Sequence, residues 1–271
     1  MPQADPIKWP NEAKGAIALT FDNLGETADR ALGNWPDDTP IGNHRTASHV
    51  VPLLIELLGD LKATFFVEGA SAALYPDAVK ALSAAGHEVA FHAMQHELWA
   101  NLSQEQEALN LAAGRTAYQM ANLEPAGFRP PGGALLPSSY PALKQAGYKY
   151  VSPVGRMARR DKETGVATVP FSWKAVDAYW FEPDMAPVRQ HKGDPAEVQS
   201  PQKWQAAIES ELALAATNNT AATLIFHLFL LDPATKEGPE RLEVLKNTIA
   251  LLQAQQDVWV APARDIAKCL P

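Results

Sequence analysis

Short apolar segments alternate along the chain with segments that have the caps and periodicity of helices. The expected strands are 16–21, 63–67, 86–91, 126–129, 148–151, 166–170, 222–226 and 258–260. The expected helices are 48–58, 76–85, 103–122, 138–146, 202–217 and 238–255, with a short helix after the last strand. This alternation favours a mainly parallel sheet or barrel over separate α and β regions, because each parallel strand needs a crossover connection. The sequence therefore predicts an α/β fold with seven or eight β/α units.

The expected elements form one domain rather than two. A chain of 271 residues can bury a substantial core. No repeat of solenoid period and no clear linker interrupts the pattern, so residues 16–271 are assigned to a single domain after a Pro-rich N-terminal arm, 1–15. Two polar stretches, 24–46 and 182–201, predict long loops of the functional or mobile kind.

Composition and charge exclude several classes of function. The net charge of −8 and the pI near 5.4 argue against a general nucleic-acid-binding protein, which needs a basic face. Because Cys269 is the one cysteine, neither an intrachain disulfide nor a cysteine-based metal site can form. No stretch approaches the roughly 18 apolar residues of a membrane span, and the N-terminus lacks the basic and apolar regions of a signal peptide. We therefore expect a cytoplasmic protein with no membrane partner, and a homo-oligomer remains open.

Polar residues with catalytic or metal-binding chemistry follow four of the expected strands. They are Asp22 with Asn23, His92 with His96, Arg129, and His227. Because the carboxyl ends of parallel strands lie on one face of a barrel, we expect these side chains to meet at one rim. Imidazole nitrogen is a good ligand for zinc and its neighbours. Two imidazoles four residues apart can aim at one point, which predicts a metal site.

Each of these residues also has a purely structural interpretation. The histidines His92 and His96 could be surface or capping residues, and Asp22 could cap a turn. Arg129 could form a salt bridge at the rim, and His227 could be a hydrogen-bonded core histidine. The functional interpretation depends on four independent strands that deliver these residue types to one face.

The same residues resemble the motifs of the polysaccharide deacetylase family of carbohydrate esterases, which includes the nodulation-type chitooligosaccharide deacetylases. Thr20-Phe21-Asp22-Asn23 is similar to the family's Thr-Phe-Asp-Asp motif, and His92-x-x-x-His96 is similar to its metal motif. Arg129-Pro130-Pro131-Gly132-Gly133 is similar to Arg-Pro-Pro-Tyr-Gly, and Leu224-Ile225-Phe226-His227 to the final Leu-x-x-His strand. The order and approximate spacing also agree, over residues 16 to about 260. The resemblance implies a distorted, incomplete (β/α) barrel of the deformed TIM-barrel type.

The resemblance also implies a role for each residue in amide hydrolysis. Asp22 is expected to act as general base, and Arg129 to orient its carboxylate. The two histidines His92 and His96 are expected to hold one divalent metal, zinc in the simplest case, and His227 to protonate the leaving amine. The chemistry agrees, because a metal polarises the carbonyl, a carboxylate accepts a proton from water, and histidine is a suitable acid near neutral pH.

The chain departs from the family pattern at two positions. Asn23 replaces the second Asp of the first motif, a metal ligand, and can ligate only through its neutral carbonyl oxygen. The site is then His-His-Asn, or Asp22 moves onto the metal, or no metal binds, as in the allantoinase-like branch. Gly132 replaces the Tyr of the third motif, which is expected to open the rim. The backbone N–H of Gly132 is also a candidate oxyanion donor.

The fourth motif of the family, which is Asp-rich and contains a tryptophan, has a partial counterpart in this chain. In this stretch Asp177 is expected to support Arg129. The aromatic residues Trp173, Tyr179 and Trp180 either stack on a sugar or planar ring, or form a core and rim cluster.

Three further ionisable residues have weaker signals. Glu68 ends the second expected strand and is another candidate for the rim. The histidines His44 and His49, in and after the long 24–46 loop, are expected to be structural or exposed.

Three functions are compatible with these residues. The leading hypothesis is a metal-dependent hydrolase of carbon–nitrogen amide bonds, an N-deacetylase of amino sugars or chitooligosaccharides. The alternative is a hydrolase of small cyclic amides of the imidase or allantoinase type, which Asn23 and the expected cytoplasmic location favour. A non-catalytic sugar-binding protein is disfavoured, because binding alone does not require Asp22 and His227 together.

Overall fold

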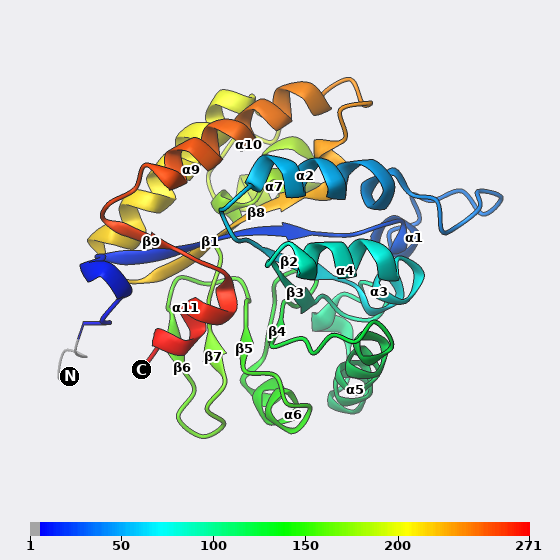
Figure 1. Ribbon diagram of the computed structural model, residues 1–271, viewed down its shortest axis with the longest axis horizontal. Coiled ribbons are helices and arrows are strands. Elements are labelled where there is room, and N and C mark those ends of the chain that lie inside the picture. Colours follow the sequence, from blue (N-terminus) through cyan, green and yellow to red (C-terminus); the bar gives the residue numbers. More distant parts are fainter. Residues whose placement is uncertain (1–5) are drawn as a thin grey trace.

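One curled sheet runs through the computed structural model, which describes residues 6–271 (Figure 1). Its strands are β1 (Gly15–Asp22), β2 (Thr64–Val67), β3 (Glu88–Phe91), β4 (Gly127–Phe128), β5 (Tyr150–Val151), β6 (Arg159–Arg160), β7 (Ala167–Thr168), β8 (Ala221–His227) and β9 (Val258–Val260). The order across the sheet is β6-β7-β5-β4-β3-β2-β1-β8, and β9 pairs with the start of β1. Every pairing is parallel except β6 with β7. The predicted α/β fold with a distorted, incomplete barrel is confirmed.

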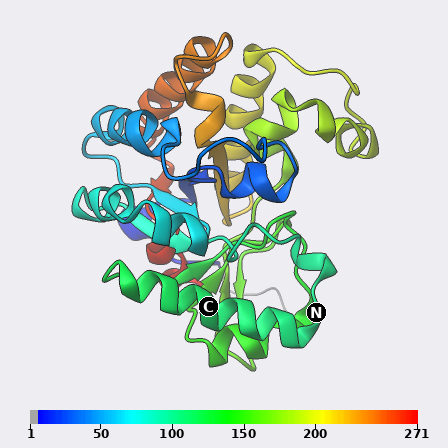
Figure 2. The same ribbon diagram turned by 90° about the vertical axis from the view of Figure 1, so that its right-hand side faces the viewer.

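Helices surround this sheet, most of them on its outer side, whereas the last helix of the chain packs against the opposite face (Figures 1 and 2). They are α1 (Thr27–Ala31), α2 (Val51–Leu58), α3 (Gly69–Leu74), α4 (Pro76–Ala84), α5 (Gln104–Met120), α6 (Tyr140–Gln145), α7 (Asp177–Phe181), α8 (Ala186–His191), α9 (Pro201–Thr217), α10 (Gly238–Gln253) and α11 (Ala263–Cys269). Short 3-10 or π turns span Pro10–Glu12, Thr46–Val50, Trp99–Asn101, Pro137–Ser139, Trp173–Ala175, Pro183–Met185 and Leu228–Leu231. In residues 6–271, no helix combines the length and the apolar character needed to cross a bilayer.

The long helices lie close to their expected positions, whereas several small elements were not expected. Helix α5 begins with the predicted capping box, in which Gln106 N–H donates to Ser103 Oγ and Ser103 N–H donates to Gln106 Oε1. Strand β6 consists of two arginines that pair antiparallel with β7, and such a short charged hairpin has no hydrophobic signature. Helices α1, α7 and α8 lie in stretches expected to be loops or motif segments. The sequence did not predict them, because their burial comes from tertiary packing.

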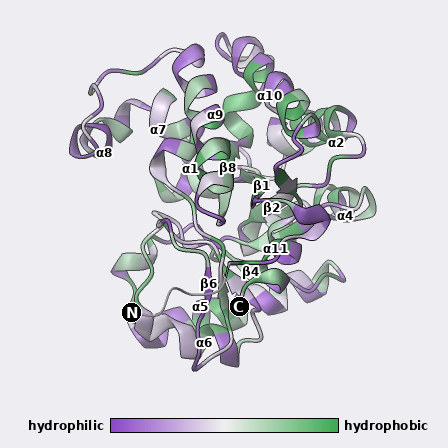
Figure 3. Cartoon of the chain, turned by 90° about the vertical axis from the view of Figure 1, so that its left-hand side faces the viewer, coloured by the Kyte–Doolittle hydropathy of each residue, from purple (hydrophilic) through white to green (hydrophobic). Residues whose placement is uncertain are grey.

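Strand β1 is buried along its whole length, and it fixes the position of the residues that follow it. All eight of its residues are buried, and β2, β8 and β9 pair with it. Phe21 stacks on Phe65 of β2 at 4.7 Å between ring centroids. Figure 3 shows the apolar strands in the interior, with hydrophilic residues prominent on the surrounding helices. The carboxyl end of β1 is therefore a rigid support for the polar residues at positions 22 and 23.

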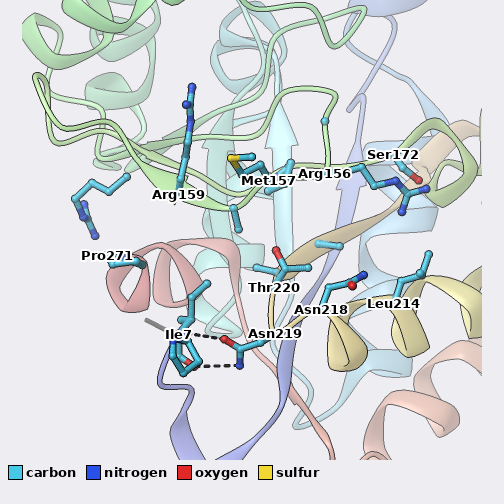
Figure 4. Close-up of a pocket in the computed structure, with 18 of the residues that line it drawn as sticks. Ile7, Arg156, Met157, Arg159, Ser172, Leu214, Asn218, Asn219, Thr220 and Pro271 are labelled. Atoms are coloured by element: carbon cyan, nitrogen blue, oxygen red, sulfur yellow. Dashed lines mark hydrogen bonds between the residues drawn. The ribbon is translucent and has the colours of Figure 1, made fainter. Parts of the chain in front are cut away.

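The described part of the expected N-terminal arm packs against the rest of the chain; residues 1–5 of that arm lie outside the described residues. Trp9 is only 5% exposed. Ile7 N–H donates to Asn219 Oδ1 at 2.5 Å, and Asn219 Nδ2 donates back to Ile7 O at 3.1 Å (Figure 4). From residue 6 onward the arm is therefore tied to the loop that precedes β8.

Buried or bidentate side-chain contacts anchor both long polar stretches. In the 24–46 stretch, Arg45 donates two hydrogen bonds to the Asp232 carboxylate, at 2.7 and 3.0 Å. In the 182–201 stretch, the fully buried guanidinium of Arg189 donates to the backbone carbonyls of Tyr179, Glu182 and Ala196.

Replacement of Arg189 by Met is expected to lower the free energy of unfolding by about 3 kcal/mol. The carbonyls of Tyr179, Glu182 and Ala196 would lose charge-assisted donors in a buried setting. Urea denaturation measures this change. The control is Lys192→Met at an exposed position just after α8, which should change stability by less than about 0.5 kcal/mol. Equal midpoints for the two variants would contradict the anchoring role of Arg189.

Candidate active site

A buried ion pair joins the carboxyl ends of β1 and β4. Arg129 Nη1 donates to Asp22 Oδ1 at 2.5 Å, and neither side chain is more than 4% exposed. The other carboxylate oxygen of Asp22, Oδ2, lies 3.9 Å from His92 Nε2. Asp22 therefore has one oxygen held by a cation and one oxygen directed toward an imidazole. This pairing of Asp22 with Arg129 agrees with the sequence-based expectation.

Hydroxyl groups and an aromatic ring hold the guanidinium of Arg129. Its nitrogens donate to the hydroxyls of Thr20 at 2.9 Å, Ser152 at 3.0 Å and Thr223 at 3.2 Å. The guanidinium carbon lies 3.9 Å from the ring centroid of Phe66. Thr20 belongs to the first motif, whereas Ser152 and Thr223 have no distinctive pattern in the sequence. Together they fix the plane of the guanidinium and so the orientation of Asp22.

His92 and His96 lie in a tight loop after β3. His92 Nδ1 donates to the carbonyl oxygen of Arg129 at 2.8 Å, which leaves the lone pair on Nε2 free. The two rings are 5.1 Å apart between centroids, and their planes are 71° apart. Burial lowers the pKa of each imidazole to about 3, so both are neutral and able to ligate near neutral pH. Ala93 and His96 both have positive φ, a conformation that non-glycine residues adopt at a cost and that is common at functional sites.

His227 is the last residue of β8 and lies beside Asp22 in the register of β1 with β8. Its Nδ1 donates to Asp177 Oδ1 at 2.5 Å, and its backbone N–H donates to Asp177 Oδ2 at 2.7 Å. Burial by itself would lower the pKa of His227, but the Asp177 carboxylate outweighs it and the pKa is raised. This geometry corrects the expectation for Asp177, which orients and charges His227 and does not contact Arg129.

Comparison with known proteins identifies the family of the chain. The family model described as Polysaccharide deacetylase matches residues 10–151, slightly more than half of the chain. The chain belongs to the polysaccharide deacetylase family. As a member of this family it is a hydrolase of carbon–nitrogen bonds other than peptide bonds.

Relatives of the chain span most of its length. The peptidoglycan-N-acetylglucosamine deacetylase of Bacillus cereus is 28% identical over 189 residues, which cover 68% of this chain and 70% of that protein. A crystal structure from Mycobacterium smegmatis, assigned as a polysaccharide deacetylase, is 26% identical with a TM-score of 0.80 and covers 99% of this chain and 93% of its own. An allantoinase structure has a TM-score of 0.75 over 99% of this chain and 94% of its own, at 15% identity, which shows a shared fold alone.

Members of the polysaccharide deacetylase family generally depend on a metal ion, and the donor atoms of this chain are compatible with one. Two buried atoms, Asn23 Oδ1 and His96 Nδ1, have no hydrogen-bond partner among the described residues. Asn23 has a positive φ of 65°, which Asn tolerates better than most residues. In residues 6–271, no three His, Cys, Asp or Glu side chains converge as a metal site would require. A cation beside His92 and His96 would therefore need a third donor of another residue type. The amide oxygen of Asn23 is that candidate donor.

Glu68 lies beside these residues and is fully buried. Its Oε2 accepts a hydrogen bond from Leu24 N–H at 3.3 Å, whereas its Oε1 has no partner among the described residues. Burial raises the pKa of this carboxyl to about 8. A carboxyl group in such an environment is unusual, because an ionised carboxylate without a partner is costly to bury.

The aromatic residues of the fourth motif divide into core and rim. Tyr179 is fully buried with its hydroxyl bonded to Asp194, and Trp180 is 6% exposed with Nε1 bonded to Lys174 O. The expectation that Tyr179 and Trp180 stack on substrate is corrected, because their rings are part of the core. Trp173 is half-buried and packs edge-on against Phe171, so it alone of the three keeps an accessible ring.

Gly132 is exposed, and it has a φ of +75°. A Cβ at this position would lie 3.2 Å from Cδ2 of Leu98, whose side chain is 47% exposed. That Gly132 opens the rim stays a prediction. Gly133 N–H donates to Pro130 O at 2.9 Å and closes the turn around Gly132.

A groove of about 1410 Å³ lies away from these residues (Figure 4). It runs between segment 155–163 and segment 214–222, with Ile7 and Pro271 among its lining residues. Ala221 at the start of β8 borders the groove, whereas the active-site histidine is at the other end of that strand. The groove lining carries arginines and carboxylates together, so it has no strong charge preference. It is not part of the candidate active site.

Proposed function

We propose that the chain removes acetyl groups from N-acetylated amino sugars or their oligomers, with a divalent cation at His92, His96 and Asn23. The coarser activity, hydrolysis of carbon–nitrogen bonds, follows from family membership. The relative from Bacillus cereus is a peptidoglycan-N-acetylglucosamine deacetylase, which supports an amino sugar as substrate.

One observation carries the proposal: a carboxylate and an imidazole, each with its own charged partner, lie side by side at the ends of β1 and β8. Asp22 is bonded to Arg129, and His227 is bonded to Asp177. Asp22 and His227 are aligned in the parallel register of the two strands. Amide hydrolysis needs one group that accepts a proton from water and another that gives a proton to nitrogen, and this pair supplies both.

The chain's own residues divide the proton transfers between them. Asp22 Oδ2, which Arg129 leaves free, accepts a proton from the attacking water. His227 has its Nδ1–H committed to Asp177, so its Nε2 carries the proton that goes to the departing amine. The backbone N–H of Gly132 is the candidate donor to the oxyanion. A divalent cation bound at the histidines supplies Lewis acidity to the amide carbonyl.

The proposal is tested by assay of acetate release from N-acetylglucosamine oligomers and peptidoglycan fragments, with the free amines counted in parallel. Acetate and amine should appear in equal amounts, and Asp22→Asn should abolish both. Hydrolysis of small cyclic amides without acetate release from any sugar substrate would overturn the proposal.

A second candidate is the hydrolysis of a small cyclic amide. Asn23 favours it, because a neutral residue in place of the second Asp makes the cation site less negative. The bidentate pair between Arg45 and Asp232 also favours it, because it fixes the 24–46 stretch against the segment after β8. The same assay distinguishes the two candidate functions. We also propose a cytoplasmic location, which fits the hydrolysis of a small cyclic amide better.

Asp177→Asn is expected to move the alkaline limb of the pH–rate profile to lower pH. The acid form of His227 is lost as pH rises through its pKa, and the Asp177 carboxylate raises that pKa. The variant should therefore approach the wild-type rate most closely at low pH and fall behind it as pH increases. Steady-state kcat across a pH series measures the shift. The control is Asp184→Asn, at an exposed carboxylate, and an unchanged limb in Asp177→Asn would contradict the assignment.

A further inference from the structure

We propose that Glu68 supplies the negative charge that offsets the cation at the His92–His96 site, in place of the carboxylate that Asn23 lacks. This inference rests on the proposed function, because it assumes that a divalent cation binds there.

Glu68 follows β2, the strand between the two that carry the cation-site residues. In the sheet register, Asp22 of β1 is aligned with Phe66 of β2, and Val67 of β2 with Phe91 of β3. Continued by one residue, the β2–β3 register places Glu68 level with His92, and the β1–β2 register places Asn23 level with Val67, the residue before Glu68. Glu68 therefore lies at the carboxyl end of the sheet between the strands that carry Asn23 and His92.

The backbone around Glu68 is bonded to the histidine loop. His92 N–H donates to Val67 O at 3.0 Å, and Gly69 N–H donates to Ala93 O at 2.9 Å. Ala70 N–H also donates to Met94 O at 2.9 Å. This ladder keeps Glu68 in a fixed position relative to both histidines, so the charge of its carboxylate would act at a constant distance from the cation.

The described residues place no positive charge beside the carboxyl group of Glu68. Its Oε1 is buried without a hydrogen-bond partner, and no basic nitrogen in residues 6–271 forms an ion pair with it. The other two carboxylates of the site differ, since Asp22 is paired with Arg129 and Asp177 with His227. Burial, with a smaller contribution from the Asp22 carboxylate, raises the pKa of Glu68 to about 8, so this carboxyl is mostly protonated near pH 7 when no cation is bound. A dication nearby favours the ionised form, because it offsets the burial cost of the charge.

The cation site itself is short of negative charge. Its histidines are neutral and Asn23 contributes only an amide dipole, so none of the three donors opposes the charge of a dication. Because no three His, Cys, Asp or Glu side chains converge among the described residues, Glu68 acts through space rather than as a ligand. At an effective dielectric constant of about 20, a full charge several ångströms away changes a dication's affinity by at least roughly tenfold.

The test measures binding of Zn²⁺ and Co²⁺ to the metal-free protein by calorimetry. Glu68→Gln, which keeps the shape and the acceptor for Leu24 N–H, should weaken binding by about tenfold or more. Asn23→Asp should tighten binding in the wild-type background and restore at least wild-type affinity when combined with Glu68→Gln. Glu56→Gln, which removes an exposed carboxylate on α2, is the matched control and should leave affinity unchanged.

Thermal unfolding with and without Zn²⁺ gives a second measurement that does not depend on basal stability. Metal-free Glu68→Gln should unfold at or above the wild-type temperature, because the substitution removes an uncompensated buried acid. The upward shift caused by Zn²⁺ should be smaller than in the wild type, because stabilisation by a ligand follows its affinity. This comparison remains valid even if the substitution alters the fold's stability.

Two further results separate failure of this inference from failure of the cation site. If wild-type protein binds no divalent cation, or if His96→Ala binds as tightly as wild type, the proposed cation site is overturned and the role of Glu68 with it. If His96→Ala loses binding but Glu68→Gln stays within twofold of wild type, the cation site stands and the inference about Glu68 is overturned.

Discussion

Substitution of His227 by Ala is expected to lower the rate of deacetylation by about 10²–10⁴-fold, the usual value of one positioned proton donor. Asp177 accepts one hydrogen bond from the imidazole and one from the backbone N–H of His227, which holds the ring beside Asp22. Single-turnover kinetics on an N-acetylated sugar measures the loss in the chemical step.

The size of the loss should depend on the leaving group. An N-acetyl substrate with an activated aryl amine needs little protonation at nitrogen, so His227→Ala should affect it least. Phe229→Ala is the matched control, because its ring lies 5.6 Å from that of His227 and it has no proton to give. A near-wild-type rate of His227→Ala on a poor leaving group would show that His227 is only a packed core histidine.

Substitution of Arg129 by Met is expected to lower the free energy of unfolding by about 3–5 kcal/mol and to abolish activity. The variant leaves the Asp22 carboxylate buried without its cation, and the loss of one partner of a buried ion pair has this cost. Chemical denaturation at neutral pH measures the change. Arg159→Met, at an exposed arginine, should stay within about 0.5 kcal/mol of wild type.

A second substitution tests the physical reason. Combination of Asp22→Asn with Arg129→Met removes the stranded charge, so the double variant should be more stable than Arg129→Met alone while remaining inactive. If the two single effects simply add in the double variant, Asp22 and Arg129 are not coupled in the way that the 2.5 Å contact indicates.

Most of the fold and the central residues of the site could be predicted from the sequence. The apolar runs that became β1, β2, β3 and β8 are long enough to be recognised, and each ends at a polar residue. Because parallel strands expose their carboxyl ends on one face, Asp22, His92, Arg129 and His227 could be expected to meet there. The observed contacts of Asp22 with Arg129 and with His92 agree with this expectation.

Other features depend on side-chain contacts between segments that are distant in sequence. Asp177 was expected to support Arg129, yet α7 turns it toward His227, fifty residues away along the chain. Tyr179 and Trp180 have the composition of a sugar-stacking surface, and only packing shows that they are buried. The absence of an aromatic side chain at Gly132 could be read from the sequence, but the position of Leu98 beside it could not.

By itself, the sequence determined the order of the long strands and helices, the family and the types of residue at the strand ends, because these follow from local periodicity and from short motifs. The tertiary structure alone decided which carboxylate partners which base, which aromatic rings face solvent, and that Glu68 is buried without a counter-charge. Such pairings depend on distances across the sheet, and the free energy of a buried charge is set by what surrounds it rather than by its neighbours in the chain.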